Sequence, residues 1–207
     1  MTKYTSVFDM KGKTLDDFTN KYGDIFNPRF VDLEYYKAYY LGKYDETIHI
    51  FNYLAQHYDI QSVVYPGSFI HLAPSFAFSH VTYIDKYKHI DDFFEDSDVL
   101  KYLSLHKIYD EESVINFINE SYQKHIGKYN LVISSNAGPI SIECFELLDE
   151  DGLLLVNNGH SDADNAFDND QLTYLGCFEI KGDHKTVNFI EKGKSSRSET
   201  YYLFRKQ

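Results

Sequence analysis

The sequence is short of several residue types, and each shortage excludes a class of protein. It has no tryptophan, four prolines and only two cysteines, Cys144 and Cys177, in 207 residues. Two cysteines cannot build a disulfide framework or a four-cysteine zinc site, so we expect a reduced, cytoplasmic protein. No apolar run approaches the ~18 residues that a membrane-spanning helix requires, and no signal peptide opens the chain.

Basic residues are scarce relative to acidic ones. The chain has 20 Lys and Arg residues against 32 Asp and Glu residues, which gives a formal net charge of -12 at pH 7. An acidic surface repels phosphate backbones and anionic lipid, so neither a nucleic acid nor a membrane is expected as a partner. Small molecules and proteins remain as the partner classes.

Tyrosine and phenylalanine are abundant, with 19 and 16 copies. The densest tyrosine cluster lies between Leu33 and Tyr40, which we expect to be helical. In a helix, Tyr36, Tyr39 and Tyr40 would share one face. That face suits packing against a sheet edge, a homodimer contact, or a lid over a ligand.

Downstream of residue 44, short apolar runs alternate with helical patterns. The expected strands are 62–65, 81–84, 130–135 and 153–156, with a weaker one at 107–109. The expected helices are one capped by Asp45, one over 111–126 and one ending at Gly152. This alternation predicts an α/β fold with a mostly parallel sheet.

The last part of the chain breaks the alternation. Segments 172–180, 186–190 and 200–204 have strand patterns with no helix between them, so we expect antiparallel strands at the end of the sheet. We assign residues 1–44 to a helical extension and residues 45–207 to the sheet domain.

Three stretches of this pattern carry a resemblance to a known family. Val63–Ser68 places Gly67 in a loop after the first strand, Tyr83–Asp85 ends the second strand in an acid, and Tyr129–Val156 reads strand, helix, glycine and apolar strand. From Thr47 onward the chain resembles the class I S-adenosylmethionine-dependent methyltransferases. The resemblance implies a Rossmann-like three-layer sandwich, S-adenosylmethionine as cofactor, and a small molecule or a protein group as methyl acceptor.

Ligands of open α/β sheets bind beyond the carboxyl ends of the strands, so the residues that follow the strands are the candidates for the cofactor site. Tyr65, Gly67 and Ser68 follow the first strand, where they contact a ligand or simply form a turn. The resemblance implies that Asp85 accepts hydrogen bonds from both ribose hydroxyls. It also implies that Asp110, after the weak third strand, contacts the adenine amino group. Either acid can instead cap a following helix.

Ser134, Ser135 and Asn136 end the next strand, where the resemblance places groups that face both cofactor and acceptor. We predict that the two serines contact the cofactor and that the Asn136 carbonyl orients a nucleophilic amine, since methyl transfer needs mainly positioning. The alternative is a turn that leads into a helix capped by Ser141.

His160 follows the last strand of the alternating part and is a candidate general base, with an aspartate to orient it. Four aspartates follow it at spacings that lack the glycine and terminal glutamate of a calcium loop, so we expect a solvated acidic loop and no metal site. These are Asp162, Asp164, Asp168 and Asp170.

The loop after the first strand departs from the family pattern of spaced glycines. Only Gly67 is present, and Phe69 and His71 stand at the other glycine positions. This departure motivates an alternative, a methyltransferase-like binding or assembly module without catalysis. A further alternative is an NAD(P)-dependent oxidoreductase, which the acid after the second strand fits and the missing Gly-x-Gly-x-x-Gly does not.

Overall fold

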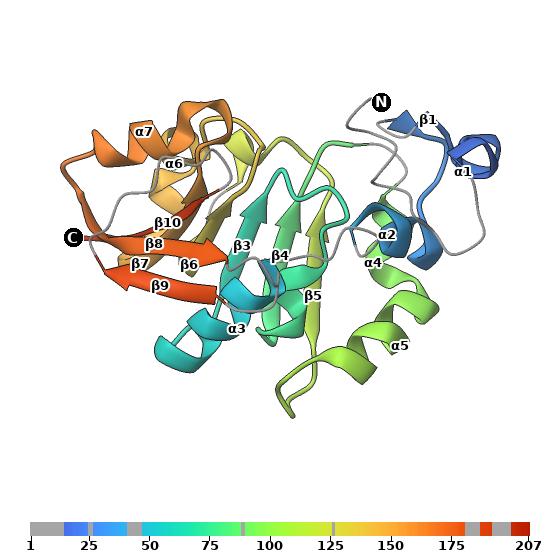
Figure 1. Ribbon diagram of the computed structural model, residues 1–207, viewed down its shortest axis with the longest axis horizontal. Coiled ribbons are helices and arrows are strands. Elements are labelled where there is room, and N and C mark those ends of the chain that lie inside the picture. Colours follow the sequence, from blue (N-terminus) through green and yellow to red (C-terminus); the bar gives the residue numbers. More distant parts are fainter. Residues whose placement is uncertain are drawn as a thin grey trace.

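The structure is a computed structural model that describes residues 15–24, 27–40, 47–87, 90–125, 127–180, 187–191 and 200–207. Its main strands are β3 (Val63–Pro66), β4 (His80–Ile84), β5 (Val114–Ile118), β6 (Tyr129–Ser134), β7 (Leu148–Asn157), β8 (Leu172–Ile180), β9 (Val187–Glu191) and β10 (Tyr201–Lys206). They form an eight-stranded sheet in the order β5-β4-β3-β6-β7-β10-β8-β9. Figure 1 shows the sheet running through the middle of the molecule.

The helices of the described residues are α1 (Leu15–Tyr22), α2 (Leu33–Tyr39), α3 (Thr47–His57), α4 (Asp91–Glu95), α5 (Ser97–His106), α6 (Ile140–Glu143) and α7 (Asp162–Phe167). Single 3-10 turns occur at η2 (Ala73–Phe76), η3 (Tyr122–Lys124), η4 (Phe145–Leu147) and η5 (Gly159–Ser161), and a small ribbon pairs β1 (Gly23–Asp24) with β2 (Asn27–Pro28). No helix in the described ranges has both the length and the apolar character needed to cross a membrane.

The direction of the strands confirms the mostly parallel sheet. Strands β3 to β7 pair in parallel, whereas β10 pairs antiparallel with both β7 and β8, and β9 pairs antiparallel with β8. The expected antiparallel finish is therefore present. Since β10 opposes both of its neighbours, β8 runs in the same direction as the parallel set.

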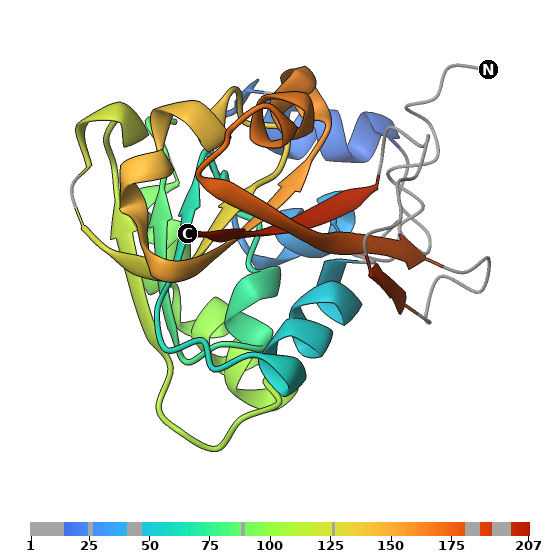
Figure 2. The same cartoon turned by 90° about the vertical axis from the view of Figure 1, so that its left-hand side faces the viewer.

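The core has two halves, one on each face of the sheet. Neighbouring residues of β3 point to opposite faces, so Val63 and Tyr65 join the cluster under α2, α3, α4 and α5, while Val64 joins the cluster under α6 and α7. Figure 2 shows α6 and α7 on one side of the sheet and α3 and α5 on the other. The predicted three-layer sandwich is confirmed.

The N-terminal extension packs on the first of these faces. Asp32 caps α2, because its side chain accepts a hydrogen bond from the Tyr35 backbone N–H. Tyr35 and Tyr36 are fully buried, and Tyr36 contacts the ring of Phe93 from α4. The predicted tyrosine helix is confirmed. Asp45, the predicted cap of α3, lies outside the described residues.

The prediction of a helix over 111–126 was wrong. Val114–Ile118 forms the edge strand β5, paired in parallel with β4, and the weak strand expected at 107–109 is not present in the described segment 90–125. Val114 and Ile118 are four residues apart, which fits a helix but also fits a strand, because four is a multiple of the strand period of two. Their β-branched side chains favour the strand.

The described loop between β3 and β4 contains a single 3-10 turn, η2, which includes Pro74. Two further segments differ from expectation. The helix expected to end at Gly152 is limited to α6 and η4, and β7 already begins at Leu148. The expected acidic loop contains α7.

Candidate functional site

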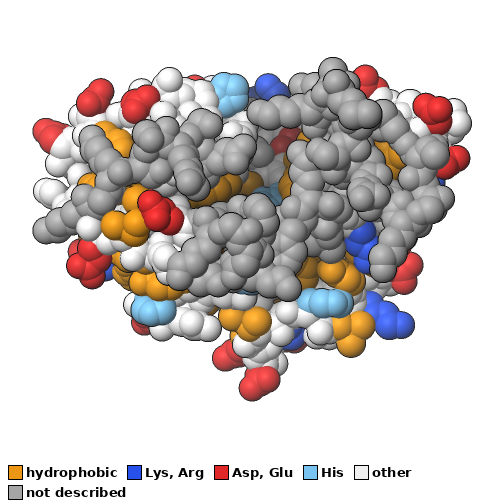
Figure 3. Space-filling view, in the orientation of Figure 1, with side chains coloured by type: hydrophobic (Ala, Val, Ile, Leu, Met, Phe, Trp, Pro, Cys, Tyr) orange, Lys and Arg blue, Asp and Glu red, His pale blue; other side chains and the backbone are white. Residues whose placement is uncertain are grey.

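Two cavities open at the carboxyl ends of the parallel strands, and Gly67 lines both. The larger has a volume of about 430 Å³ and is lined by Tyr39, Tyr40, Thr47, Tyr65, Gly67, Ser68, Phe69, His71, Tyr87, Ser135, Asn136 and Tyr201. The smaller has a volume of about 290 Å³ and is lined by Gly67, Asp85, Lys86, Glu120, Ser121, Tyr122, Gln123 and Ala137. Figure 3, in the orientation of Figure 1, shows hydrophobic side chains near the centre of the view and acidic side chains around its edge.

Gly67, which lines both cavities, lies against Ala137 in the loop after β6. Its φ is +64°, and its N–H donates a 2.7 Å hydrogen bond to the carbonyl of Ile84. A Cβ at this position would lie 2.3 Å from the Cβ of Ala137, in the loop after β6. Because both the conformation and the space exclude a side chain, only glycine lets the loops after β3 and β6 approach this closely.

Asp85, at the end of β4, holds the loop that follows β3. Its Oδ2 accepts a 2.8 Å hydrogen bond from the N–H of Phe69, and its Oδ1 accepts one of the same length from the N–H of Tyr87. The helix α4 begins only at Asp91, so the alternative role of Asp85 as a helix cap is wrong. Each carboxylate oxygen has a second lone pair, which leaves capacity for two further donors.

Phe69 adopts a conformation that is unusual for a residue other than glycine, with a φ of +47°. Its ring meets those of Tyr39 and Tyr87 at steep interplanar angles, with centroid distances of 5.9 Å and 5.3 Å. An aromatic side chain therefore forms part of the wall of the larger cavity.

A buried hydrogen-bond chain lies beside Phe69. The hydroxyl of Tyr65 is 3.0 Å from Nδ1 of His71, and Oγ1 of Thr47 is 3.3 Å from Nε2 of the same ring. The ring of Tyr40 stacks on the imidazole at a centroid distance of 4.6 Å. Tyr65 and His71 are 3% and 5% exposed. The chain thus links α2, α3 and the loop after β3 around one cavity.

Ser135 and Asn136 close the larger cavity from the side of β6. The hydroxyls of Ser135 and Tyr201 lie 2.5 Å apart, which joins this loop to β10. Asn136 has a φ of +57°, a region that asparagine tolerates, and its N–H donates to Oδ1 of Asn157 at the end of β7. The structure therefore brings both predicted residues to the cavity.

Ser134 points to the opposite face of the sheet. It is 1% exposed, lines neither cavity, and donates a 2.5 Å hydrogen bond from Oγ to Oδ2 of Asp162. Asp162 is fully buried and also accepts hydrogen bonds from the N–H and the hydroxyl of Ser141. The expectations that Asp162 lies in a solvated loop and that Ser141 caps a helix were both wrong.

Two other predicted site residues lie away from the cavities. Asp110 precedes β5 instead of following a strand, so it lies toward the amino ends of the strands, and no helix follows it for it to cap. Its predicted placement beside the adenine was wrong, because the third strand is β5. His160 is exposed, has a φ of +57°, and lines neither cavity.

The correct third strand adds residues that the sequence reading missed. Glu120 and Ser121 follow β5 and line the smaller cavity together with Asp85 and Lys86. Glu120 and Ser121 are an acid and a hydroxyl residue that follow the apolar run Val114–Ile118, a pattern typical of a strand end. We overlooked it because we had assigned 111–126 to a helix. Tyr87, two residues after Asp85, lines the larger cavity.

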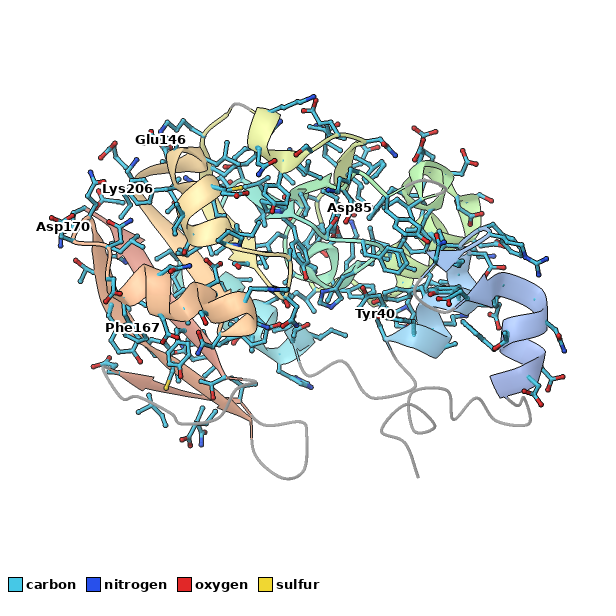
Figure 4. All side chains as sticks on the ribbon, turned by 90° about the horizontal axis from the view of Figure 1, so that it is seen from above. Tyr40, Asp85, Glu146, Phe167, Asp170 and Lys206 are labelled. Atoms are coloured by element: carbon cyan, nitrogen blue, oxygen red, sulfur yellow. The ribbon has the colours of Figure 1, made fainter. Side chains whose placement is uncertain are left out.

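Within the described ranges no group of three or more His, Cys, Asp and Glu residues is arranged to hold a metal ion. Burial raises the pKa of Tyr39, and burial together with the charges of Asp24 and Asp85 raises the pKa of Tyr87, so both phenols are uncharged near neutral pH. Figure 4 shows Tyr40 and Asp85 in the same part of the molecule and Asp170 at its other end.

Comparison with known proteins identifies the fold. No family model and no curated protein matches the sequence. Among solved structures, the complex of aTrm5 with tRNA-Leu and the tRNA m1G37 methyltransferase of M. jannaschii both align with a TM-score of 0.50, at 14% and 16% identity. Both alignments cover 78% of this chain, which spans 46% and 49% of those two chains.

A third structure, the N-methyltransferase NodS from Bradyrhizobium japonicum WM9, aligns with a TM-score of 0.47 at 10% identity, over 77% of this chain and 92% of that one. The first two alignments carry the assignment: the chain has the fold of class I S-adenosylmethionine-dependent methyltransferases. One of them is a complex with tRNA, so the fold gives no support to the expectation that nucleic acid is excluded.

Proposed function

We propose that the protein is an S-adenosylmethionine-dependent methyltransferase whose cofactor spans the two cavities across Gly67. One observation carries the proposal: Gly67, Asp85 and Ser135 come from the ends of β3, β4 and β6 and meet where the strand order reverses. A reversal of this kind is where ligands bind in open α/β sheets. The larger cavity, at about 430 Å³, is within the size range of small-molecule sites.

The residues present fit this cofactor. Gly67 lines both cavities, and Asp85 retains lone pairs for the two ribose hydroxyls while it holds the loop. In this arrangement the adenosine occupies the smaller cavity with Glu120 and Ser121. The methionine part and the acceptor share the larger cavity, where Tyr39 and Tyr40 of the N-terminal extension act as a lid.

When bound, S-adenosylmethionine supplies a methyl group that is already strongly electrophilic. The chain therefore has to position the acceptor and exclude water. Asn136 faces the larger cavity, where its carbonyl orients the nucleophilic group, and Tyr65 and Ser135 supply hydroxyl contacts. His160 has no part in this mechanism, because it is exposed and lines neither cavity.

A second candidate function is a binding module without catalysis. Its support is that both carboxylate oxygens of Asp85 already accept backbone hydrogen bonds, and that Phe69 places a ring where the family has a small residue. In this case the ring of Phe69 and its aromatic neighbours occupy part of the space in which a methyltransferase would hold its cofactor.

Calorimetry with S-adenosylhomocysteine separates the two functions. The methyltransferase proposal predicts one binding site, and Asp85→Asn should weaken binding about tenfold or more, since one charge-assisted acceptor is worth about 1.5–3 kcal/mol. Asp170→Asn makes the same charge change at an exposed residue far from the cavities and should leave binding unchanged. No heat at millimolar ligand, with folded protein, would favour the binding module.

A further inference from the structure

The described wall of the larger cavity is rich in aromatic residues. Besides His71, six of its twelve lining residues have aromatic rings: Tyr39, Tyr40, Tyr65, Phe69, Tyr87 and Tyr201. The other lining residues are Gly67 and four with small neutral polar side chains, and among these described residues there is no Lys, Arg, Asp or Glu. Recognition by the described lining therefore depends on aromatic rings and neutral hydrogen-bonding groups.

The rings of Tyr39, Tyr40, Phe69 and Tyr87 meet at steep angles instead of forming one flat surface. Tyr39 meets Tyr40 at 66° and Phe69 at 68°, and Phe69 meets Tyr87 at 82°. These rings come from the C-terminal end of α2 and from the loops after β3 and β4, which are separate segments of the chain. Edge-to-face contacts fix each ring by its neighbour, so the wall is formed before a ligand arrives.

Such a wall attracts cations. The face of an aromatic ring carries partial negative charge, and several rings around one space make a site for ammonium groups. The overall charge of -12 raises the local concentration of cations and lowers that of anions. The phenol oxygens can in addition accept N–H hydrogen bonds.

We propose that the larger cavity binds a small alkylammonium ion between these rings and that, given the methyltransferase function proposed above, the amine of this ligand is the methyl acceptor. The proposal narrows the acceptor to small organic amines.

The chemistry balances within the same wall. The bound ammonium first gives a proton to the Tyr65 oxygen as Tyr65 passes its own proton to Nδ1 of His71, 3.0 Å away. The amine lone pair then forms the new C–N bond while the C–S bond breaks, and the electron pair of that bond stays on sulfur. Positive charge moves from sulfur to nitrogen, so the cavity holds an onium ion before and after transfer.

The test compares choline with its neutral carbon isostere, 3,3-dimethylbutan-1-ol, by calorimetry on the full chain at low salt. The two have nearly the same shape, so a difference in affinity measures the effect of charge. We expect choline to bind about tenfold more tightly or better, the ratio that a desolvated cation–π contact supports. Equal affinities, or no binding of either compound, would overturn the proposal.

Variants of Tyr40 show whether the rings are responsible. Tyr40→Phe keeps the ring and should keep the preference for choline, whereas Tyr40→Leu should reduce choline affinity about fivefold without changing that of the alcohol. Tyr58→Leu removes a half-buried tyrosine that does not line the cavity and serves as the matched control. Equal loss of both ligands in Tyr40→Leu would show simple apolar packing and would contradict the proposal.

S-adenosylhomocysteine binding, measured on the same samples, keeps this inference separate from the proposed function. If S-adenosylhomocysteine binds and choline shows no preference, the cation site fails while the methyltransferase proposal stands. If choline is preferred and S-adenosylhomocysteine does not bind, the cation site stands and its role as methyl-acceptor site fails.

Discussion

Phe69 donates its backbone N–H to Oδ2 of Asp85 at 2.8 Å, and this bond holds the loop after β3 against the end of β4. The same carboxylate accepts the N–H of Tyr87, so one side chain fixes two aromatic residues of the larger cavity. Asp85, directly after β4, therefore holds the wall of the larger cavity in place even without a ligand.

Asp85→Ala should destabilise the protein itself. It leaves the N–H groups of Phe69 and Tyr87 without their acceptor, which costs about 1–3 kcal/mol of the free energy of unfolding. Urea denaturation measures this loss, with Asp170→Ala as the control. An unchanged midpoint in Asp85→Ala would mean that the loop does not depend on this carboxylate.

Gly67→Ala should reduce both stability and S-adenosylhomocysteine binding. The new Cβ would lie 2.3 Å from that of Ala137, at a φ of +64° that costs a non-glycine residue about 1–3 kcal/mol. The double variant Gly67→Ala with Ala137→Gly removes the clash but keeps the backbone strain, so it should recover only part of the melting temperature. Full recovery would show that position 67 requires glycine only because of the contact with Ala137, and that the positive φ adds no cost.

Removal of the Asp162 carboxylate should destabilise the contact of α7 with β6 and α6. Asp162→Ala leaves the Ser134 hydroxyl and the Ser141 N–H buried without their acceptor, while the Ser141 hydroxyl keeps only its 3.2 Å hydrogen bond to the Asp162 backbone carbonyl. We expect a loss of more than about 2 kcal/mol in the free energy of unfolding, because each buried orphaned group costs about 1–3 kcal/mol. Asp164→Ala, at an exposed position of the same helix, should cost much less.

Cys144 should resist alkylation in the native protein. Burial, together with the charges of Glu143 and Asp162, raises the pKa of its thiol to about 12, so almost no thiolate forms at pH 8. Cys177 is also buried. We expect maleimide labelling of neither cysteine until denaturant is added, and rapid native labelling of Cys144 would contradict the burial of α6.

The cap of α2 should give a pH-dependent contribution to stability. Burial alone would raise the pKa of Asp32, but hydrogen bonds from the Tyr35 N–H, Tyr22 and Lys21 outweigh it and lower the pKa below 3.8. A lowered pKa stabilises the folded protein above the unfolded value of about 3.9, and this contribution is lost as the pH falls through the folded value.

Asp32→Ala should therefore lower the free energy of unfolding by about 1 kcal/mol at pH 7, as expected for a lost helix cap. The difference between wild type and variant should shrink below about pH 4. Thermal melts at pH 7, 5 and 3 measure it, and a constant difference across this range would show that the charge of Asp32 contributes nothing.

The sequence predicted the strands whose apolar runs are short, buried and followed by a turn. β3, β4, β6 and β8 lie within one or two residues of their expected positions, as does the tyrosine helix α2. Strong local patterns of this kind leave little choice between helix and strand. Gly67, Asp85, Ser135 and Asn136 reached the candidate site because they follow such strands.

Residues on the weaker elements were misplaced because tertiary pairing decided their structure. Val114 and Ile118 became an edge strand only through pairing with β4, and this moved the third strand end from Asp110 to Glu120. Asp162 looked solvated among other aspartates, yet Ser134 and Ser141, more than twenty residues away in sequence, provide the hydrogen bonds that allow its burial. No local pattern encodes partners at that distance.

The position of β10 sets a limit on folding during synthesis. Tyr201–Lys206 pairs with β7 on one side and β8 on the other, so β8 and β9 have no place in the sheet until the ribosome has made these residues. Until then the nascent chain can form only the parallel part of the sheet, from β5 to β7, and the edge of β7 is unpaired. An exposed edge of this kind is a template for aggregation. We therefore expect the nascent chain to depend on chaperones until β10 emerges.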